Sequence, residues 1–206
     1  MRKIICQTLL TLVLFTTTVK AQIVNIDRNP GVDFEPGLYY KDLDKLLDPY
    51  VGTWLYTNGN TSLRIKLEKK EHYLYQTSYM SFYTDLIVGE FQYVENGNLV
   101  MDRIPLLNDT SIDYFDYSIT CFGIYRLNAF DPFPEANPLI RMLRARYNDP
   151  VKPFLDFKAV LALNDEIENE RLIFYFLRTN MSNVTDDVTP LDPVFPTGQY
   201  VLSKVP

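Results

Sequence analysis

The segment "YVGTWLYTNGNTSLRIKL", Tyr50 to Leu67, decides the fold class of this chain. Apolar and charged residues alternate from Leu63 to Leu67, which is the period of a strand with one buried face. Asn58-Gly59 precedes this run, and an Asn-Gly pair favours a type I′ hairpin because both residues tolerate positive φ. The segment therefore predicts two antiparallel strands joined by a tight turn, with the only tryptophan, Trp54, in the first strand.

The same pattern recurs further along the chain. A second pair, Asn96-Gly97, separates alternating runs at 87–95 and 99–104. Further strands are expected at 115–121, 155–163, 172–177 and 200–204. We therefore expect an all-β fold, an antiparallel up-and-down barrel of about eight to ten strands. A two-sheet β-sandwich is the alternative, because the strand count does not separate the two.

Two segments depart from the strand pattern. In "YYKDLDKLLDPY" (Tyr39 to Tyr50), leucines spaced at i, i+3 and i+4 predict one short N-terminal helix, which Pro49 ends near Leu47. Prolines crowd residues 128–153, so we expect an edge strand or a short helix at 139–147 and no central strand. A second proline-rich loop is expected at 185–196.

The first residues have the features of an export signal. Arg2 and Lys3 are basic, Leu9 to Phe15 is apolar, and Val19-Lys20-Ala21 provides a small-residue cleavage site before Gln22. The apolar stretch is shorter than the ~20 residues that span a bilayer. We expect a signal peptide at 1–21, a loose leader at 22–36 and a single barrel domain at 37–206, with no membrane span. The protein would then be periplasmic or secreted.

Charge and cysteine content exclude some functions. The chain has a net charge of −6, with 26 acidic and 20 basic residues. All basic residues of the signal would be lost on export, so the mature chain would be more acidic still. An acidic surface repels phosphate backbones, so nucleic acid is not an expected partner. Only Cys121 would survive processing, which excludes an intrachain disulfide.

Two resemblances to known families follow from these motifs. "VGTW" (Val51 to Trp54) at the start of the first strand resembles the Gly-x-Trp motif of lipocalins and their calycin relatives. That resemblance implies structural roles for Gly52 and Trp54, with the indole closing the barrel floor and Lys204 lying across it. The order of "YYKDLDKLLDPYVGTW", "LIVGEFQYVENG", "CFG" and "VLSK" is similar to a family of small uncharacterised exported proteins of Flavobacterium-type bacteria, which implies no function.

We find no constellation of catalytic residues. His72 is the only histidine and falls on the polar face of its strand, so neither a zinc site nor a Ser-His-Asp triad is expected. The pairs Asp85/Glu90 and Asp113/Asp116 are spaced to point to opposite faces, which disfavours paired carboxylate catalysis. Cys121 lies on an apolar face and is expected to be buried. We expect no enzyme, no metal and no cofactor.

The aromatic residues, 15 Tyr and 13 Phe, suggest what the barrel holds. Such rings either fill the interior or line a small cavity, and a filled core is the favoured interpretation. The candidate ligand contacts are Phe91, Tyr93, Tyr117 and Phe174. A basic cluster, Arg141, Arg144 and Arg146, is typical of a solvated face, and the alternative is an anion or lipid-headgroup site at the barrel mouth.

Two hypotheses about function remain open. The first is an exported lipocalin-like module that binds a small apolar or amphipathic ligand, at the end of the barrel far from Trp54. The second is a structural or protein-interaction domain of the cell envelope with a filled core. The structural set common to both is Gly52, Trp54, Asn58, Gly59 and Lys204.

Overall fold

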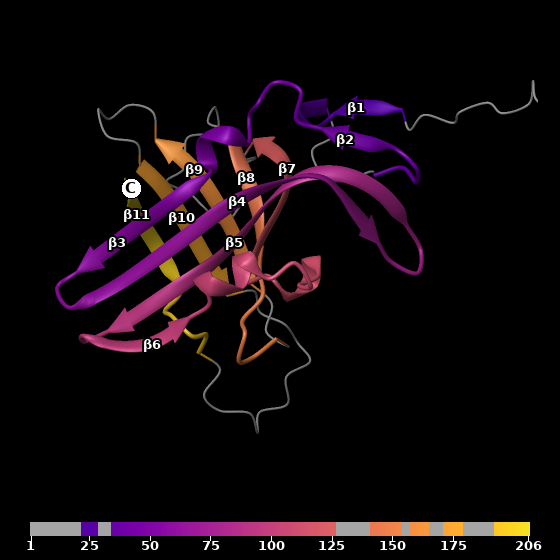
Figure 1. Ribbon diagram of the computed structural model, residues 1–206. Helices are drawn as coiled ribbons and strands as arrows, with labels where there is room; N and C mark the ends of the chain where they lie inside the picture. Colours follow the sequence, from indigo (N-terminus) through magenta and orange to yellow (C-terminus); the bar gives the residue numbers. More distant parts are fainter. Residues whose placement is uncertain (1–21, 29–33, 127–140, 154–156, 165–170, 179–191) are drawn as a thin grey trace, which may run out of the picture.

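The computed structural model describes residues 22–28, 34–126, 141–153, 157–164, 171–178 and 192–206 (Figure 1). These residues form strands and short 3₁₀ turns. The strands are β1 Ile23–Asn25, β2 Tyr39–Lys41, β3 Gly52–Asn58, β4 Thr61–Gln76, β5 Ser81–Glu95, β6 Asn98–Asp102, β7 Ile119–Arg126, β8 Arg141–Tyr147, β9 Phe157–Asn164, β10 Arg171–Arg178 and β11 Gly198–Val205. The 3₁₀ turns are η1 Ile26–Arg28, η2 Asp48–Tyr50, η3 Ile104–Asn108 and η4 Tyr114–Asp116.

Eight of these strands close into an antiparallel barrel. From β3 the order runs β3-β4-β5-β7-β8-β9-β10-β11, and β11 pairs with β3 again. Each strand is antiparallel to both neighbours. The predicted all-β up-and-down barrel is confirmed, and the sandwich is excluded because the β5–β7 and β3–β11 pairings close the sheet on itself.

Alternation in the sequence sets which side chains face inward. Leu63, Ile65 and Leu67 on β4 are fully buried, as the segment around Trp54 predicts. Strand β10 is apolar on both faces. Its residues Leu172, Phe174 and Phe176 join the barrel core, while Tyr175 packs with Met142, Val160 and Ala162 on the outer face.

The two hairpins use different turns. In the β5–β6 hairpin, Glu95 pairs with Asn98, and both loop residues, Asn96 and Gly97, have positive φ, as a type I′ turn requires. In the β3–β4 hairpin, Asn58 pairs with Thr61, so the loop is Gly59-Asn60. Only Gly59 there has positive φ, the pattern of a type II′ turn. The first turn therefore lies one residue later than predicted.

The predicted N-terminal helix is wrong. Residues 39–41 form β2, which pairs in parallel with β5, and only η2 is helical before β3. The Asp42 carboxylate accepts the backbone N–H groups of Leu46 (2.8 Å) and Leu47 (3.0 Å), so the segment folds as a turn around this side chain. Leu47 is buried while Leu43 is exposed, so the i, i+3, i+4 leucines do not share one face.

The predicted loose leader is also wrong over its described part. Strand β1 pairs in parallel with β2, and Tyr39 donates its backbone N–H to the Gln22 carbonyl at 3.0 Å. Ile26 in η1 is fully buried in the barrel core. These elements lie at the upper end of the barrel in Figure 1, so residues 22–28 help to close that end.

Two expectations for the middle of the chain are corrected. Residues 141–147 form β8, which pairs on both edges, because the described prolines, Pro150 and Pro153, lie beyond its end. The strand expected at 115–121 begins only at Ile119, since residues 114–116 form η4. Leu155, expected in β9, lies outside the described residues.

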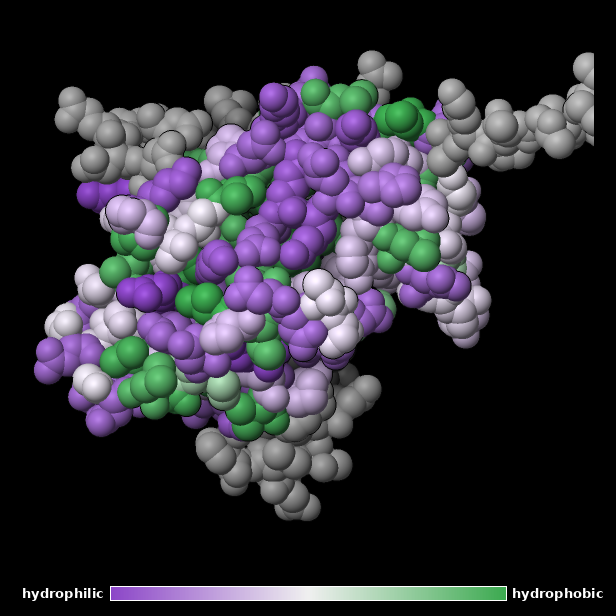
Figure 2. Space-filling view, viewed as in Figure 1, coloured by the Kyte–Doolittle hydropathy of each residue, from purple (hydrophilic) through white to green (hydrophobic). Residues whose placement is uncertain are grey.

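A second layer covers the outer face of β4 and β5. The segment with η3 and η4 folds back over β5 and buries Leu86, Val88, Leu107, Tyr114 and Tyr117 in a small cluster separate from the barrel core. Figure 2 shows hydrophilic residues along the exposed part of β4, with apolar residues gathered near β6. In the parts of the chain that the structure describes, no helix has the length and apolar character of a membrane span.

Candidate functional site: a tyrosine pocket at one end of the barrel

The barrel has a sealed end at Trp54. This side chain is fully buried, and its Nε1–H donates to the Tyr50 carbonyl at 2.9 Å. Lys204 pairs with Trp54 across the β3–β11 seam, and its Nζ lies 5.2 Å from the ring centroid. Gly52 has φ +137, and a Cβ there would meet Lys204 Cε at 3.1 Å. Glycine at this position thus leaves room for the lysine chain.

The interior above this floor is filled by aromatic side chains. Phe195 is fully buried, and its ring centroid lies 5.0 Å from Phe91, 5.0 Å from Phe176 and 5.2 Å from Tyr147. It lies in the loop before β11, and because Trp54 pairs with Lys204 near the other end of β11, Phe195 enters the barrel at the end opposite Trp54. Phe195 therefore closes this end of the barrel, and we call its side chain the plug. This packing fits the favoured interpretation of a filled core.

The plug is held by the buried carboxylate of Asp149. Its Oδ2 accepts the Val194 N–H at 2.8 Å, and its Oδ1 accepts the backbone N–H groups of Val151 and Lys152, both at 2.9 Å. Lys152 Nζ also donates to the Asp192 carbonyl. One carboxylate thus joins the loop after β8 to the loop that carries Phe195.

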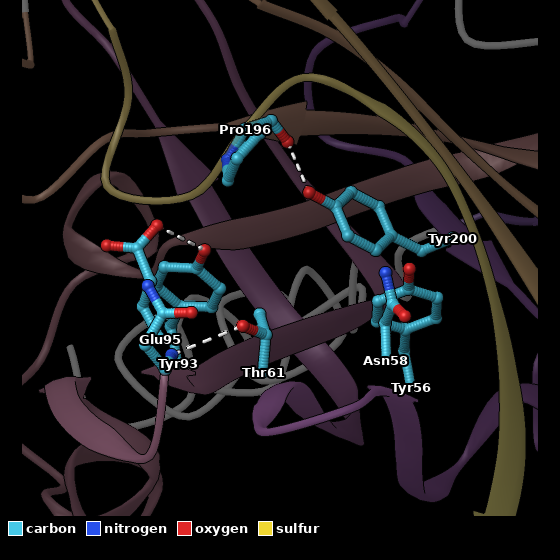
Figure 3. A pocket seen from close by; sticks show the side chains of 8 residues that line it. Tyr56, Asn58, Thr61, Tyr93, Glu95, Pro196 and Tyr200 are labelled. Atoms are coloured by element: carbon cyan, nitrogen blue, oxygen red, sulfur yellow. Dashed lines mark hydrogen bonds between the residues drawn. The ribbon is translucent and has the colours of Figure 1, made fainter.

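A pocket of 320 Å³ opens at this same end, beside the plug (Figure 3). It falls at the small end of the usual range for ligand sites. The side chains come from the β3–β4 and β5–β6 hairpins, from the loop before β11 and from β11 itself. They are Tyr56, Asn58, Thr61, Tyr93, Glu95, Asn96, Pro196 and Tyr200. This pocket lies at the end of the barrel far from Trp54.

Hydrogen bonds fix the tyrosine rings of the pocket. Tyr200 packs edge-on against Tyr56, with centroids 5.0 Å apart, and donates its hydroxyl to the Pro196 carbonyl. Tyr93 donates its hydroxyl to Glu95 Oε1 at 3.3 Å. Burial raises the pKa of Tyr200, and burial together with the nearby Glu95 charge raises the pKa of Tyr93. Both hydroxyls therefore stay protonated and act as donors at neutral pH.

The four predicted ligand contacts do not lie together. Tyr93 lines the pocket, whereas Phe91 and Phe174 are fully buried in the core beneath it. Tyr117 belongs to the outer cluster, because the chain turns through η4 just before it and β7 starts only at Ile119. The alternation of apolar residues predicts that Tyr117 points into the barrel, and this prediction is wrong.

The remaining sequence candidates lie away from the pocket. Arg144 and Arg146 are exposed on the outer face of β8, and Arg146 lies over the Phe115 ring at 5.4 Å. These two arginines are thus on the barrel wall and not at its mouth, while the side chain of Arg141 lies outside the described part of the structure. His72 is exposed at a bulge in β4, stacked on Tyr83 at 4.2 Å between centroids. Cys121 is fully buried, and burial raises the pKa of its thiol.

Two carboxylates on β5, those of Asp85 and Glu90, are buried, and each has separate partners. Asp85 accepts the Tyr39 hydroxyl at 2.6 Å and the backbone N–H groups of Asp42 (3.0 Å) and His72 (2.9 Å). These bonds attach β2 and the β4 bulge to β5. All three of these hydrogen-bond donors belong to the chain itself, so the Asp85 carboxylate has a structural role.

Glu90 anchors the outer layer. Its carboxylate receives Arg103 Nε at 3.0 Å and Nη2 at 3.3 Å, together with the Ser118 hydroxyl at 2.6 Å. The Arg103 Nη2 also donates to the Asp116 carbonyl at 2.9 Å. The described residues contain no cluster of three or more His, Cys, Asp or Glu side chains that would suit a metal ion.

Sequence reasoning missed most of the pocket. Tyr56, Glu95 and Tyr200 were not singled out, and Phe195 was placed in a proline-rich loop. A usable signal was present: Tyr56 follows Trp54 by two residues, so both face inward on β3. Phe195 lies in "DPVFPTG", a segment rich in proline and polar residues with no strand alternation. A large apolar residue in such a segment indicates a loop side chain that packs into the core.

Comparison with known proteins places the chain in a family without assigning an activity. The model of a family of unknown function, DUF6705, matches residues 1–205. The chain belongs to the DUF6705 family. No curated protein and no solved structure matches it. Membership of DUF6705 assigns no activity to the pocket or to the barrel.

Proposed function

We propose that this protein is an exported, lipocalin-like binding module that holds a small amphipathic ligand in the tyrosine pocket. The observation that carries the proposal is the pocket's position, at the end of the barrel opposite the Trp54 floor and lined by three tyrosine rings. Such a lining combines apolar ring faces with polar groups that orient a ligand. The proposed activity is binding and not catalysis.

Depth and size limit what the pocket accepts. Because Phe195 plugs the barrel below it, the ligand would sit at the mouth, with part of its surface in water. The proposed ligand is therefore a small molecule with an apolar part and a polar part. A long acyl chain running down the barrel axis would require the Phe195 side chain to leave its site.

A titration with a neutral apolar dye such as Nile red tests the proposal. We expect saturable binding to the folded chain, and Tyr56→Ala should weaken it about tenfold, the factor for ~1.4 kcal/mol of ring contact. Tyr83→Ala is the matched control, since this half-buried tyrosine stacks on His72, away from the pocket. Absence of saturable binding, or equal losses in both variants, would disprove the proposal.

A specific observation favours a second candidate, an interaction domain with a filled core. Leu99 and Val100 on β6 are 61% and 46% exposed, and β6 pairs with no described strand other than β5. An exposed apolar strand with a free edge can pair with another chain. Under this alternative, Leu99→Lys with Val100→Lys should abolish recovery of a partner from envelope extract while dye binding stays absent in both proteins.

A further inference from the structure

The chemistry of the tyrosine pocket also indicates what charge its ligand carries. We propose that the pocket takes a small organic cation, a quaternary ammonium or protonated amine with an apolar substituent. This inference rests on the proposed function and specifies its ligand class. It stands on the ring geometry and on the charges of the lining residues that the structure describes, which include one carboxylate and no basic side chain.

The rings provide the first step. Tyr56, Tyr93 and Tyr200 come from three different strands, and all three line the same 320 Å³ space (Figure 3). The face of an aromatic ring carries negative electrostatic potential and attracts a cation lying within about 6 Å of its centre. Several rings around one space suit a cation whose charge is spread over methyl groups, because such an ion loses little hydration on entering.

Glu95 provides the second step. Its carboxylate lies at the pocket rim, where the Tyr93 hydroxyl donates to it at 3.3 Å. Among the residues that the structure describes, no lysine, arginine or histidine forms an ion pair with Glu95. The other polar lining residues, Asn58, Thr61 and Asn96, are neutral. The described part of the lining therefore has one negative charge and no positive charge.

Some of the other polar groups that line the pocket already form hydrogen bonds within the protein. Thr61 Oγ1 accepts the Asn96 N–H at 3.2 Å, and Tyr200 donates its hydroxyl to the Pro196 carbonyl. An anionic ligand would face Glu95, and none of the described lining residues supplies a cation to offset the repulsion. A cation would gain attraction from Glu95, from the three rings and from the net charge of −6 on the chain.

The test compares choline with 3,3-dimethylbutan-1-ol, the uncharged molecule of the same shape, by isothermal titration calorimetry on the chain from Gln22 onward. We expect choline to bind about tenfold more tightly than the alcohol at low salt. Glu95→Gln should remove most of this difference. Glu71→Gln, which neutralises an exposed glutamate of β4 outside the pocket, should leave it intact.

Three outcomes overturn the inference, and they separate it from the proposed function. If the alcohol binds as tightly as choline, or if only Nile red binds, the pocket accepts neutral ligands and the proposed function stands. If Glu95→Gln and Glu71→Gln weaken choline equally, binding depends on overall charge and the pocket is not a cation site. If choline, the alcohol and Nile red all fail to bind, both proposals are wrong.

Discussion

Lys204 lies across the indole of Trp54 at the seam between the last and first strands of the barrel, with its Nζ 5.2 Å from the ring centroid. The two residues are direct partners in the β11–β3 register, so the stacking and the backbone pairing form together. Gly52, two residues before Trp54, leaves the space through which the lysine chain passes.

Trp54→Ala should lower the free energy of unfolding by about 3–5 kcal/mol, as large-to-small changes of buried aromatic residues do. Lys204→Met should cost about 0.5–2 kcal/mol, because it keeps the aliphatic chain and removes only the cation. Denaturant unfolding measures both. Lys158→Met, an exposed lysine of β9, is the control and should change stability by only a few tenths of a kcal/mol. Equal effects of the two lysine variants would contradict a role for Lys204 in stacking.

Phe195→Ala should open the barrel interior toward the pocket. The loss of a buried ring should cost about 3–5 kcal/mol, and the space left should admit a small apolar molecule such as benzene. The measurement is the rise in melting temperature when benzene is added. Phe82→Ala is the matched control, since Phe82 is equally buried but packs near Phe34 and Tyr75. A rise for Phe82→Ala but none for Phe195→Ala would show that Phe195 is not a plug.

Arg103→Met should destabilise the protein strongly, by about 3–5 kcal/mol, because it leaves the fully buried Glu90 carboxylate without its cation. The double variant Arg103→Met with Glu90→Leu should recover much of this loss, since no buried charge remains. Denaturant unfolding of both single variants and the double variant gives the coupling free energy. Additive effects would mean that the pair does not act as a unit.

Cys121 should be inert in the folded protein. Burial raises the pKa of its thiol, so the reactive thiolate is scarce and reagents do not reach it. In the chain that starts at Gln22, iodoacetamide at pH 8 should label no cysteine in minutes under native conditions and one after unfolding in guanidinium. Mass spectrometry counts the labels, and rapid native labelling would show that β7 opens locally.

Stability should decrease above pH 10 in part through Tyr73. Burial, with the hydrogen bond to Asp113, raises its pKa to about 12, so the folded state favours the protonated phenol. A raised pKa stabilises the fold fully below the unfolded value near 10, and this stability is lost as pH rises through about 12. Melting temperatures between pH 9 and 12 should fall less steeply for Tyr73→Phe. An unchanged slope would exclude Tyr73 as a contributor.

The barrel was predictable because its signals are local. Alternation around Leu63 and the Asn96-Gly97 turn each involve a few neighbouring residues, and both are present as expected. The helix at 39–47 failed because a tertiary interaction competed with it: β2 pairs with β5, and the Asp42 side chain takes the backbone N–H groups of Leu46 and Leu47. The helical spacing of the leucines carries no information about the pairing of β2 with β5 or about the hydrogen bonds to Asp42.

The pocket was less predictable because it is assembled from distant segments. Tyr56, Glu95 and Tyr200 meet only when β3, β5 and β11 are placed in one barrel. Each is unremarkable in its own strand. Tyr117 shows the opposite failure, since a local turn at η4 breaks the alternation and moves the ring to the outer layer. The face to which a side chain points was therefore predictable only where no turn interrupts the two-residue alternation of the strand.

The seam between β3 and β11 also has a consequence for how the barrel is made. Its partners Trp54 and Lys204 are about 150 residues apart in sequence, so this pairing has the largest loop-closure entropy of any in the barrel. Closure is therefore expected late in folding. Until then β3 and β11 expose unpaired edges, which are templates for aggregation. The same lysine that covers the indole in the native state places a charge on that edge, where it opposes pairing with a second chain.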